Sequence, residues 1–85
     1  MPRYMIERTL PKGAIDGLDD AALKSLQSTN ATFGVKWIQS YMSGDKTKTY
    51  CIYEGPNEKA VRDANAKTQV PFERIVEIPE DLKPR

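Results

Sequence analysis

The sequence contains no histidine and only one cysteine, Cys51. Histidine is the commonest general base near neutral pH and the commonest nitrogen ligand for zinc, copper and nickel. Its absence excludes the usual histidine-based catalytic sets and imidazole metal sites. A single cysteine excludes a disulfide within the chain and any paired-cysteine zinc motif. Because unpaired cysteine fits a reducing compartment, we expect a cytoplasmic protein.

Long hydrophobic runs are also missing, and neither sign of charge is in excess. The first ten residues, MPRYMIERTL, include charged side chains, so they predict neither a secretory signal peptide nor a membrane span. The chain has 13 Lys and Arg residues against 12 Asp and Glu residues, a net charge of +1. Nucleic-acid binders usually present a strongly basic face. We therefore expect neither a membrane nor a nucleic acid as a partner.

The length and composition indicate one small folded domain over residues 1–85. With 39% hydrophobic and 29% charged residues, the chain has the composition of a globular protein rather than a disordered one. A domain of this size buries only roughly 60–65% of the surface that its unfolded chain exposes. Association with a second copy is a natural way to cover part of the remainder.

The spacing of apolar residues predicts a strand and then a helix in the first half of the chain. Residues 2–10 mix aromatic, aliphatic and charged residues as a strand does, and the turn formers at 11–13 end it. From Asp16 onward, apolar residues recur every three or four positions. This period predicts a helix over 17–33, with Asp16 as its N-cap and Gly34 at its C-terminal end.

The second half predicts a hairpin, a second helix and a last strand. The runs VKWIQSYMS and TKTYCIYE are rich in β-branched and aromatic residues, and Gly44-Asp45 between them suits a tight hairpin turn. A second helix is expected over 57–68, ended by Val70-Pro71, and the run RIVEI predicts the last strand.

This order of elements is that of the ferredoxin-like βαββαβ fold, in the α+β class. We expect one four-stranded antiparallel sheet, with the strands in the order 4-1-3-2 and both helices on a single face. The other face of such a sheet is left to solvent or to a partner.

The hairpin turn predicts which side chains occupy that open face. With Gly44-Asp45 at its centre, Ile38 pairs with Cys51 and Trp37 with Ile52. The small apolar set Ile38, Met42, Cys51 and Tyr53 then suits the core. The opposite face carries Trp37, Gln39, Tyr41, Lys48, Tyr50, Ile52 and Glu54. Because large aromatic residues mixed with polar groups mark interfaces and ligand surfaces, we predict that this set forms the dimer or ligand-binding face.

Three side chains are candidate ligands for a divalent metal, namely Glu7, Glu54 and Cys51. Strand carboxylates are more often solvated or paired with cations, and a cysteine in the middle of a strand more often behaves as a small hydrophobe. Oxygen ligands alone also suit magnesium, calcium or manganese better than nickel. The identity of any cofactor therefore stays open at this stage.

Several short motifs, spread over nearly the whole chain, resemble one known family. They are the ERTLP start, the aromatic SY strand, the CIYEGP junction and the PFER run. In order and spacing they resemble small bacterial ferredoxin-like proteins, described mainly as a domain of unknown function, which include a nickel-binding dimeric protein. The resemblance implies a ferredoxin-like fold, a homodimer and a metal. This chain departs from family members that place a histidine in the second helix, because it has Ala64 and Asn65 there, so we expect nickel binding to be weak or absent.

These observations favour a non-catalytic homodimeric module that binds a small ligand or a metal. The alternative is a small enzyme of the dimeric α/β-barrel type, acting on a small molecule in a pocket on the open sheet face. In that case Glu54 or Glu7 would be the base and a tyrosine hydroxyl the proton donor. A third hypothesis is an interaction subunit with no ligand of its own. The sequence contains no recognisable catalytic set, and we assign no catalytic residue.

Overall fold

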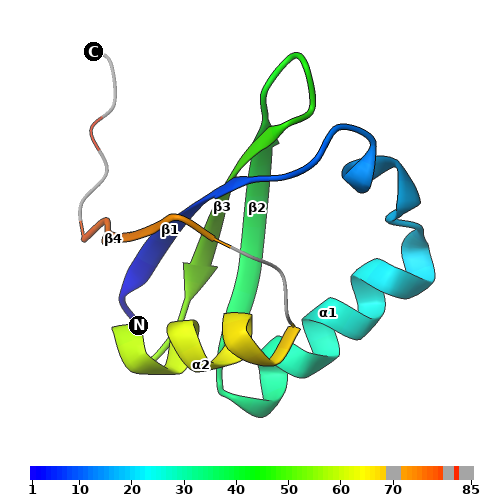
Figure 1. Cartoon of the computed structure of the whole chain (residues 1–85). Coiled ribbons are helices and arrows are strands. Elements are labelled where there is room, and N and C mark those ends of the chain that lie inside the picture. The colour runs from blue at the N-terminus through cyan, green and yellow to red at the C-terminus, as the bar shows by residue number, and fades with distance from the viewer. Residues whose placement is uncertain (69–71, 80–81, 83–85) are drawn as a thin grey trace.

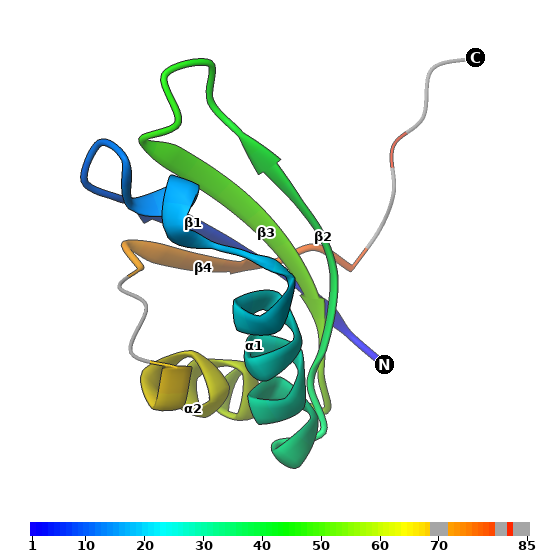
Figure 2. The same ribbon diagram turned by 90° about the vertical axis from the view of Figure 1, so that its right-hand side faces the viewer.

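The computed structural model describes residues 1–68, 72–79 and 82. Along the chain lie β1 (Arg3–Thr9), a short 3-10 helix (Ala14–Gly17), α1 (Asp20–Thr32), β2 (Lys36–Met42), β3 (Lys48–Glu54), α2 (Glu58–Thr68) and β4 (Arg74–Glu77). The strands form one antiparallel sheet in the order β2-β3-β1-β4 (Figure 1). Figure 2 shows both helices on the same side of this sheet. The predicted ferredoxin-like fold and strand order are confirmed.

Helix α1 begins later than the sequence spacing predicts. Its N-cap is Asp19, whose carboxylate accepts a hydrogen bond of 2.8 Å from the backbone N–H of Ala22. Asp16, the predicted cap, lies in the 3-10 helix instead, so that prediction was wrong. The error arises because two aspartates three residues apart offer the same capping chemistry. At the other end, Gly34 has a φ of +71°, the left-handed conformation expected just beyond a helix.

Helix α2 lies within its predicted range. The side chain of Asn57 caps it by accepting a hydrogen bond of 2.8 Å from the backbone N–H of Ala60. The predicted stop at Val70-Pro71 lies outside the described residues. None of the helices in the described part of the chain is long and apolar enough to cross a membrane.

The turn between β2 and β3 is longer than predicted. The backbone N–H of Ser43 donates to the carbonyl of Lys48 at 2.9 Å, so this pair closes the hairpin around residues 44–47. The Asp45 carboxylate holds the loop, because it accepts hydrogen bonds from the Ser43 hydroxyl at 2.7 Å and from the Thr47 hydroxyl at 2.7 Å. Lys46 takes a positive φ of 62°. Between the turn and Gln39, the register of β2 against β3 is therefore shifted by two residues from the predicted one.

An extra residue in β2 changes the face on which Trp37 lies. Gln39 pairs with Ile52, whereas Trp37 pairs with Tyr53, so Ile38 forms a β-bulge between them. Because side chains alternate along a strand, one extra residue moves the preceding side chain to the opposite face. Trp37 packs against the core beneath the helices, and its predicted place on the open face was wrong. Ile38, predicted for the core, is 42% exposed.

The core lies between the sheet and the two helices. Along β3 every second residue is buried, which is the alternation expected of a strand covered on one face. The buried core residues are Tyr4, Ile6, Val35, Cys51, Tyr53, Val61 and Ala64. The two core members that were predicted on β3, Cys51 and Tyr53, are both buried, whereas Met42 on β2 is 49% exposed.

Candidate functional site

The sheet face turned away from the helices carries three rows of side chains, because paired residues of neighbouring strands point to the same side. The central row is Gln39, Ile52, Met5 and Val76. The row nearer the β2–β3 turn is Tyr41, Tyr50, Glu7 and Arg74, and the row on the far side is Lys36, Glu54 and Arg3. We call these three rows the open face.

The open face holds most of the residues predicted for it. Its three rows contain five of the predicted residues, namely Gln39, Tyr41, Tyr50, Ile52 and Glu54. Lys48 lies opposite Thr9, between the β2–β3 turn and the nearest row. Of the predicted set, only Trp37 lies on the opposite side of the sheet. The bulge in β2 carries no local sequence signal that would have revealed this.

The central row is the most apolar part of the open face. Ile52, Met5 and Val76 are each half-buried by their neighbours within the sheet. In the row nearer the β2–β3 turn, Tyr41 is 57% exposed. Both helices lie on the other side of the sheet, so no described helix covers these side chains (Figure 2). The central row is therefore an apolar strip that no described helix covers.

Ion pairs border the apolar strip on both sides. The Glu7 carboxylate lies 3.1 Å from the Lys48 ammonium and 3.7 Å from the Arg74 guanidinium. On the far row, Arg3 lies 3.9 Å from Glu54. The hydrogen bond to Glu7 and the charge of Glu73 raise the pKa of Lys48, because both carboxylates favour the charged ammonium. The strip is thus enclosed by paired charges of both signs.

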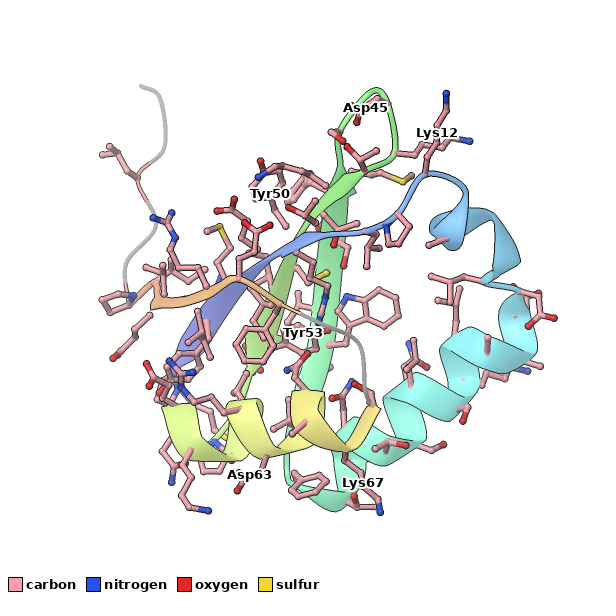
Figure 3. All side chains as sticks on the ribbon, in the orientation of Figure 1. Lys12, Asp45, Tyr50, Tyr53, Asp63 and Lys67 are labelled. Atoms are coloured by element: carbon pink, nitrogen blue, oxygen red, sulfur yellow. The ribbon has the colours of Figure 1, made fainter. Side chains whose placement is uncertain are left out.

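A polar cluster that sequence analysis missed lies on the opposite face, beneath the helices. Arg8 is only 5% exposed, and its guanidinium donates to the Tyr53 hydroxyl at 2.9 Å and to the side-chain oxygen of Asn65. Asn65 in turn donates to the carbonyl of Val61 at 2.8 Å. Figure 3 places Tyr53 between the sheet and α2. Burial raises the pKa of Tyr53, although the nearby Arg8 charge acts in the opposite direction.

The place of Arg8 on the core face could have been predicted from the sequence. Arg8 follows Tyr4 and Ile6 at intervals of two, so strand alternation places all three on the core face. Because charged residues are rarely buried, this alternation did not lead to a prediction that Arg8 lies in the core.

The candidate metal ligands do not converge. Cys51 is buried on the helix side, where its sulfur lies 3.8 Å from the Thr49 hydroxyl. Glu7 and Glu54 lie on the open face, in rows separated by the central apolar row. Among the described residues, no group of three or more Cys, Asp or Glu side chains is placed to hold a metal ion.

The comparisons with known proteins agree with the fold and the motifs. A family model described as "Nickel responsive protein SCO4226-like" matches residues 4–78. The chain belongs to this family. The resemblance drawn from the sequence motifs is thereby confirmed.

A solved structure of an SCO4226-like protein shares the fold. It is the crystal structure of SCO4226 from Streptomyces coelicolor A3(2), with a TM-score of 0.67 and 18% sequence identity. The alignment covers 94% of this chain and 99% of that chain. No curated protein matches the sequence.

The side chains of this SCO4226-like chain do not fit nickel. Nickel sites in proteins favour imidazole and thiolate ligands. This chain has no histidine, and its one thiol, Cys51, is buried away from the carboxylates of the open face. We therefore derive no function for this chain through a bound nickel ion.

Proposed function

We propose that this chain is a non-catalytic homodimeric binding module in which two copies join through the open face. The observation that carries the proposal is the apolar central row of Ile52, Met5 and Val76, enclosed by rows of paired charges. An apolar centre with a polar rim is the usual anatomy of a protein–protein interface. In a dimer with two-fold symmetry, the apolar row of one copy packs against the same row of the other copy.

The energetics support association through this strip. Fully burying a large apolar side chain contributes about 1.5–3 kcal/mol relative to leaving it exposed. Ile52, Met5 and Val76 are half-buried already, so each contributes a fraction of that value. Each residue contributes from both copies of a two-fold dimer. Burial of the exposed Tyr41 ring adds to the free energy gained. The gain opposes an association cost of about 4–15 kcal/mol, so the dimer depends on burying the whole strip at once.

The polar members of the open face suit a small ligand held between the two copies. Gln39, Tyr41 and Tyr50 offer an amide and two hydroxyls on neighbouring strands, beside the apolar row. Such a mixture of an apolar wall with a few hydrogen-bonding groups is typical of small-molecule sites. Because nickel lacks a ligand set here, we propose a small polar organic molecule as the ligand.

Sedimentation velocity at micromolar concentration tests the dimer. We expect the wild-type protein to sediment as a dimer and Ile52→Glu to sediment as a monomer, because the substitution places a charge in the centre of the seam. Ala66→Glu is the matched control, since Ala66 is exposed on α2, on the helix side of the molecule. A monomeric wild-type protein would show that the open face does not join two copies.

Titration with nickel tests the metal expectation. Protein without a histidine tag should show weak, non-saturating heat changes in calorimetry, because exposed carboxylates alone hold nickel poorly. Native mass spectrometry of the same sample reports the subunit number together with any retained small molecule. Tight nickel binding in a fixed ratio to protein would contradict the expectation.

A further inference from the structure

The row on the far side of the open face contains an ammonium group that no described carboxylate pairs. Lys36, Glu54 and Arg3 lie side by side in this row, on β2, β3 and β1. The Glu54 carboxylate, opposite Lys36 in the register, lies 3.9 Å from Arg3. The side chain of Lys36 is exposed and forms no ion pair or hydrogen bond with the described residues. Its charge is therefore left to solvent or to a ligand.

Two more polar side chains of β2 lie on the open face without a hydrogen-bond partner among the described residues. Gln39 lies in the central row and Tyr41 in the row nearer the β2–β3 turn, and both are exposed. An ammonium, a side-chain amide and a phenol each donate hydrogen bonds. Strand β2 thus presents three donors, one of them charged, and no carboxylate.

The carboxylate of the row nearer the turn is already engaged with cations. Glu7 lies 3.1 Å from the Lys48 ammonium and 3.7 Å from the Arg74 guanidinium. A cationic ligand would have to displace one of these partners, whereas an anionic ligand meets the Lys36 ammonium directly. The charges of the open face therefore favour an anion beside β2.

Closing the proposed dimer seam strengthens this preference. Taking an unpaired ammonium out of water costs free energy, so the seam needs an anion near Lys36. A carboxylate that accepts from the Lys36 ammonium and the Gln39 amide offsets the cost, because charge-assisted hydrogen bonds are stronger than neutral ones. The two residues lie in neighbouring rows of one strand, roughly 7 Å apart along the backbone, and the flexible lysine stem spans that distance.

The apolar residues beside these donors define the rest of the ligand. From Gln39 the central row continues through Ile52, Met5 and Val76, which are half-buried. Strands lie about 4.8 Å apart, so the row extends roughly 10 Å from Gln39 to Met5. An inorganic anion would leave this row bare, whereas an organic anion with an apolar body covers it.

We propose that the ligand of the open face is a small organic carboxylate whose charged group binds Lys36 and Gln39 and whose apolar body lies along the central row. An apolar wall with a few polar groups that fix the ligand is the usual composition of a small-molecule site. This inference deepens the proposed function and rests on it, because the second copy supplies the other wall of the site.

Hexanoate is the probe, and two related compounds separate its charge from its apolar chain. Hexanamide has the same chain without the charge, and acetate has the charge without the chain. In NMR titrations of isotope-labelled protein, we expect hexanoate to shift the amide signals of β2 and β3 saturably. Hexanamide should bind about five- to tenfold more weakly, the effect of one charge-assisted hydrogen bond. Equal binding of hexanoate and hexanamide, or of hexanoate and acetate, would overturn the proposal.

Substitution of Lys36 locates the site. Lys36→Met keeps most of the aliphatic stem and should weaken hexanoate binding about tenfold, whereas Lys36→Arg should retain most of the affinity. Lys24→Met is the matched control, because Lys24 is an exposed lysine of α1, on the helix side of the sheet. The spectra also report whether each variant is folded. An unchanged affinity in Lys36→Met, or an equal loss in Lys24→Met, would overturn the proposal.

Sedimentation velocity of the same samples distinguishes failure of the ligand proposal from failure of the dimer. Hexanoate held between two copies should raise the dimer fraction of the wild type but not that of Lys36→Met. A wild-type protein that stays monomeric yet binds hexanoate through Lys36 would overturn the dimer and support the carboxylate site. A dimer that Lys36→Met weakens without any binding of hexanoate would show that Lys36 pairs with a carboxylate of the second copy, which would overturn the ligand proposal alone.

Discussion

The two faces of the sheet carry the same kinds of residue in opposite surroundings. The helix side holds Ile6, Arg8 and Tyr53, all buried, whereas the open face holds Ile52, Arg3 and Tyr50, all at least partly exposed. Residue type therefore does not distinguish the two faces. Their difference lies in what covers them, because both helices pack on one side alone (Figure 2).

The comparison shows that each face uses its polar residues differently. On the helix side, Arg8, Tyr53 and Asn65 form a hydrogen-bond cluster within the core. Buried polar groups contribute to stability only when they are paired, so each member of that cluster depends on the others. On the open face, Arg3 and Glu54 form a partly exposed pair that water already solvates well. Equal substitutions on the two faces should therefore have unequal effects.

Substitution of one isoleucine on each face, Ile6 and Ile52, should give the largest difference in the free energy of unfolding. Ile6→Ala removes a fully buried side chain and leaves a cavity, so we expect the free energy of unfolding to fall by about 2–5 kcal/mol. Ile52→Ala should cost about 1 kcal/mol or less in the monomer, because Ile52 is only half-buried there. Urea unfolding, extrapolated to low protein concentration, measures both values. Equal losses would mean that the open face is packed as tightly as the core.

Substitution of one arginine on each face, Arg8 and Arg3, should give the next largest difference in the free energy of unfolding. Arg8→Met leaves the Tyr53 hydroxyl and the Asn65 oxygen without their buried donor, at an expected cost of about 1–3 kcal/mol. Arg3→Met removes an exposed ion pair at 3.9 Å and should cost about 0–1 kcal/mol. Methionine keeps the aliphatic packing of each side chain, so the comparison isolates the guanidinium group. A larger loss for Arg3→Met in chemical denaturation would contradict the assignment of the two faces.

The tyrosine pair tests a single hydroxyl on each face. Tyr53→Phe removes the hydroxyl that accepts from Arg8 at 2.9 Å, and we expect a loss of about 1 kcal/mol. Tyr50→Phe should leave the unfolding free energy nearly unchanged and should weaken ligand binding instead. Thermal unfolding of both variants provides the measurement, and a stabilised Tyr53→Phe protein would show that the hydroxyl is poorly paired.

The pH dependence of stability should reveal the smallest difference. Burial raises the pKa of Tyr53 above its ordinary value of 10.0, so the folded state holds the phenolic proton more tightly than the unfolded state does. The resulting stability is fully present below about pH 10 and is lost as the pH rises through the raised pKa. Unfolding measured from about pH 8 to 11 should show a shallower alkaline loss in Tyr53→Phe than in wild type. Parallel curves would show that Tyr53 does not titrate differently in the two states.

Local patterns in the sequence predicted the elements and their order correctly. Helical spacing, turn formers and runs of β-branched residues act over a few neighbours, so they can be read without a structure. The N-cap of α1 was misplaced for the same reason, because Asp16 and Asp19 look alike locally and only packing distinguishes them. The open face was predicted largely correctly, since a register shift of two residues preserves the side on which Gln39 and Tyr41 lie.

The errors concern features that depend on side-chain hydrogen bonds, on a bulge or on contacts between distant segments. The hairpin loop was misjudged because the hydrogen bonds of the Asp45 side chain favour a longer turn than Gly44-Asp45 suggests by composition. Trp37 was placed on the wrong face because the bulge at Ile38 interrupts the strand alternation on which the prediction relied. The Arg8 cluster was overlooked because its partners are 45 and 57 residues away along the chain.

The sequence by itself determined the α+β class, the succession of elements, the strand order of the sheet and the lack of an imidazole metal site. These follow from composition and from periodicities that operate within a few residues. Only the tertiary structure decided which partners the buried Arg8 has, which way Trp37 turns and that the candidate metal ligands Glu7, Glu54 and Cys51 lie apart. The physical reason is that side-chain direction depends on register. Register in turn is set by the side-chain hydrogen bonds of the hairpin loop, by the bulge in β2 and by packing between residues remote in the chain.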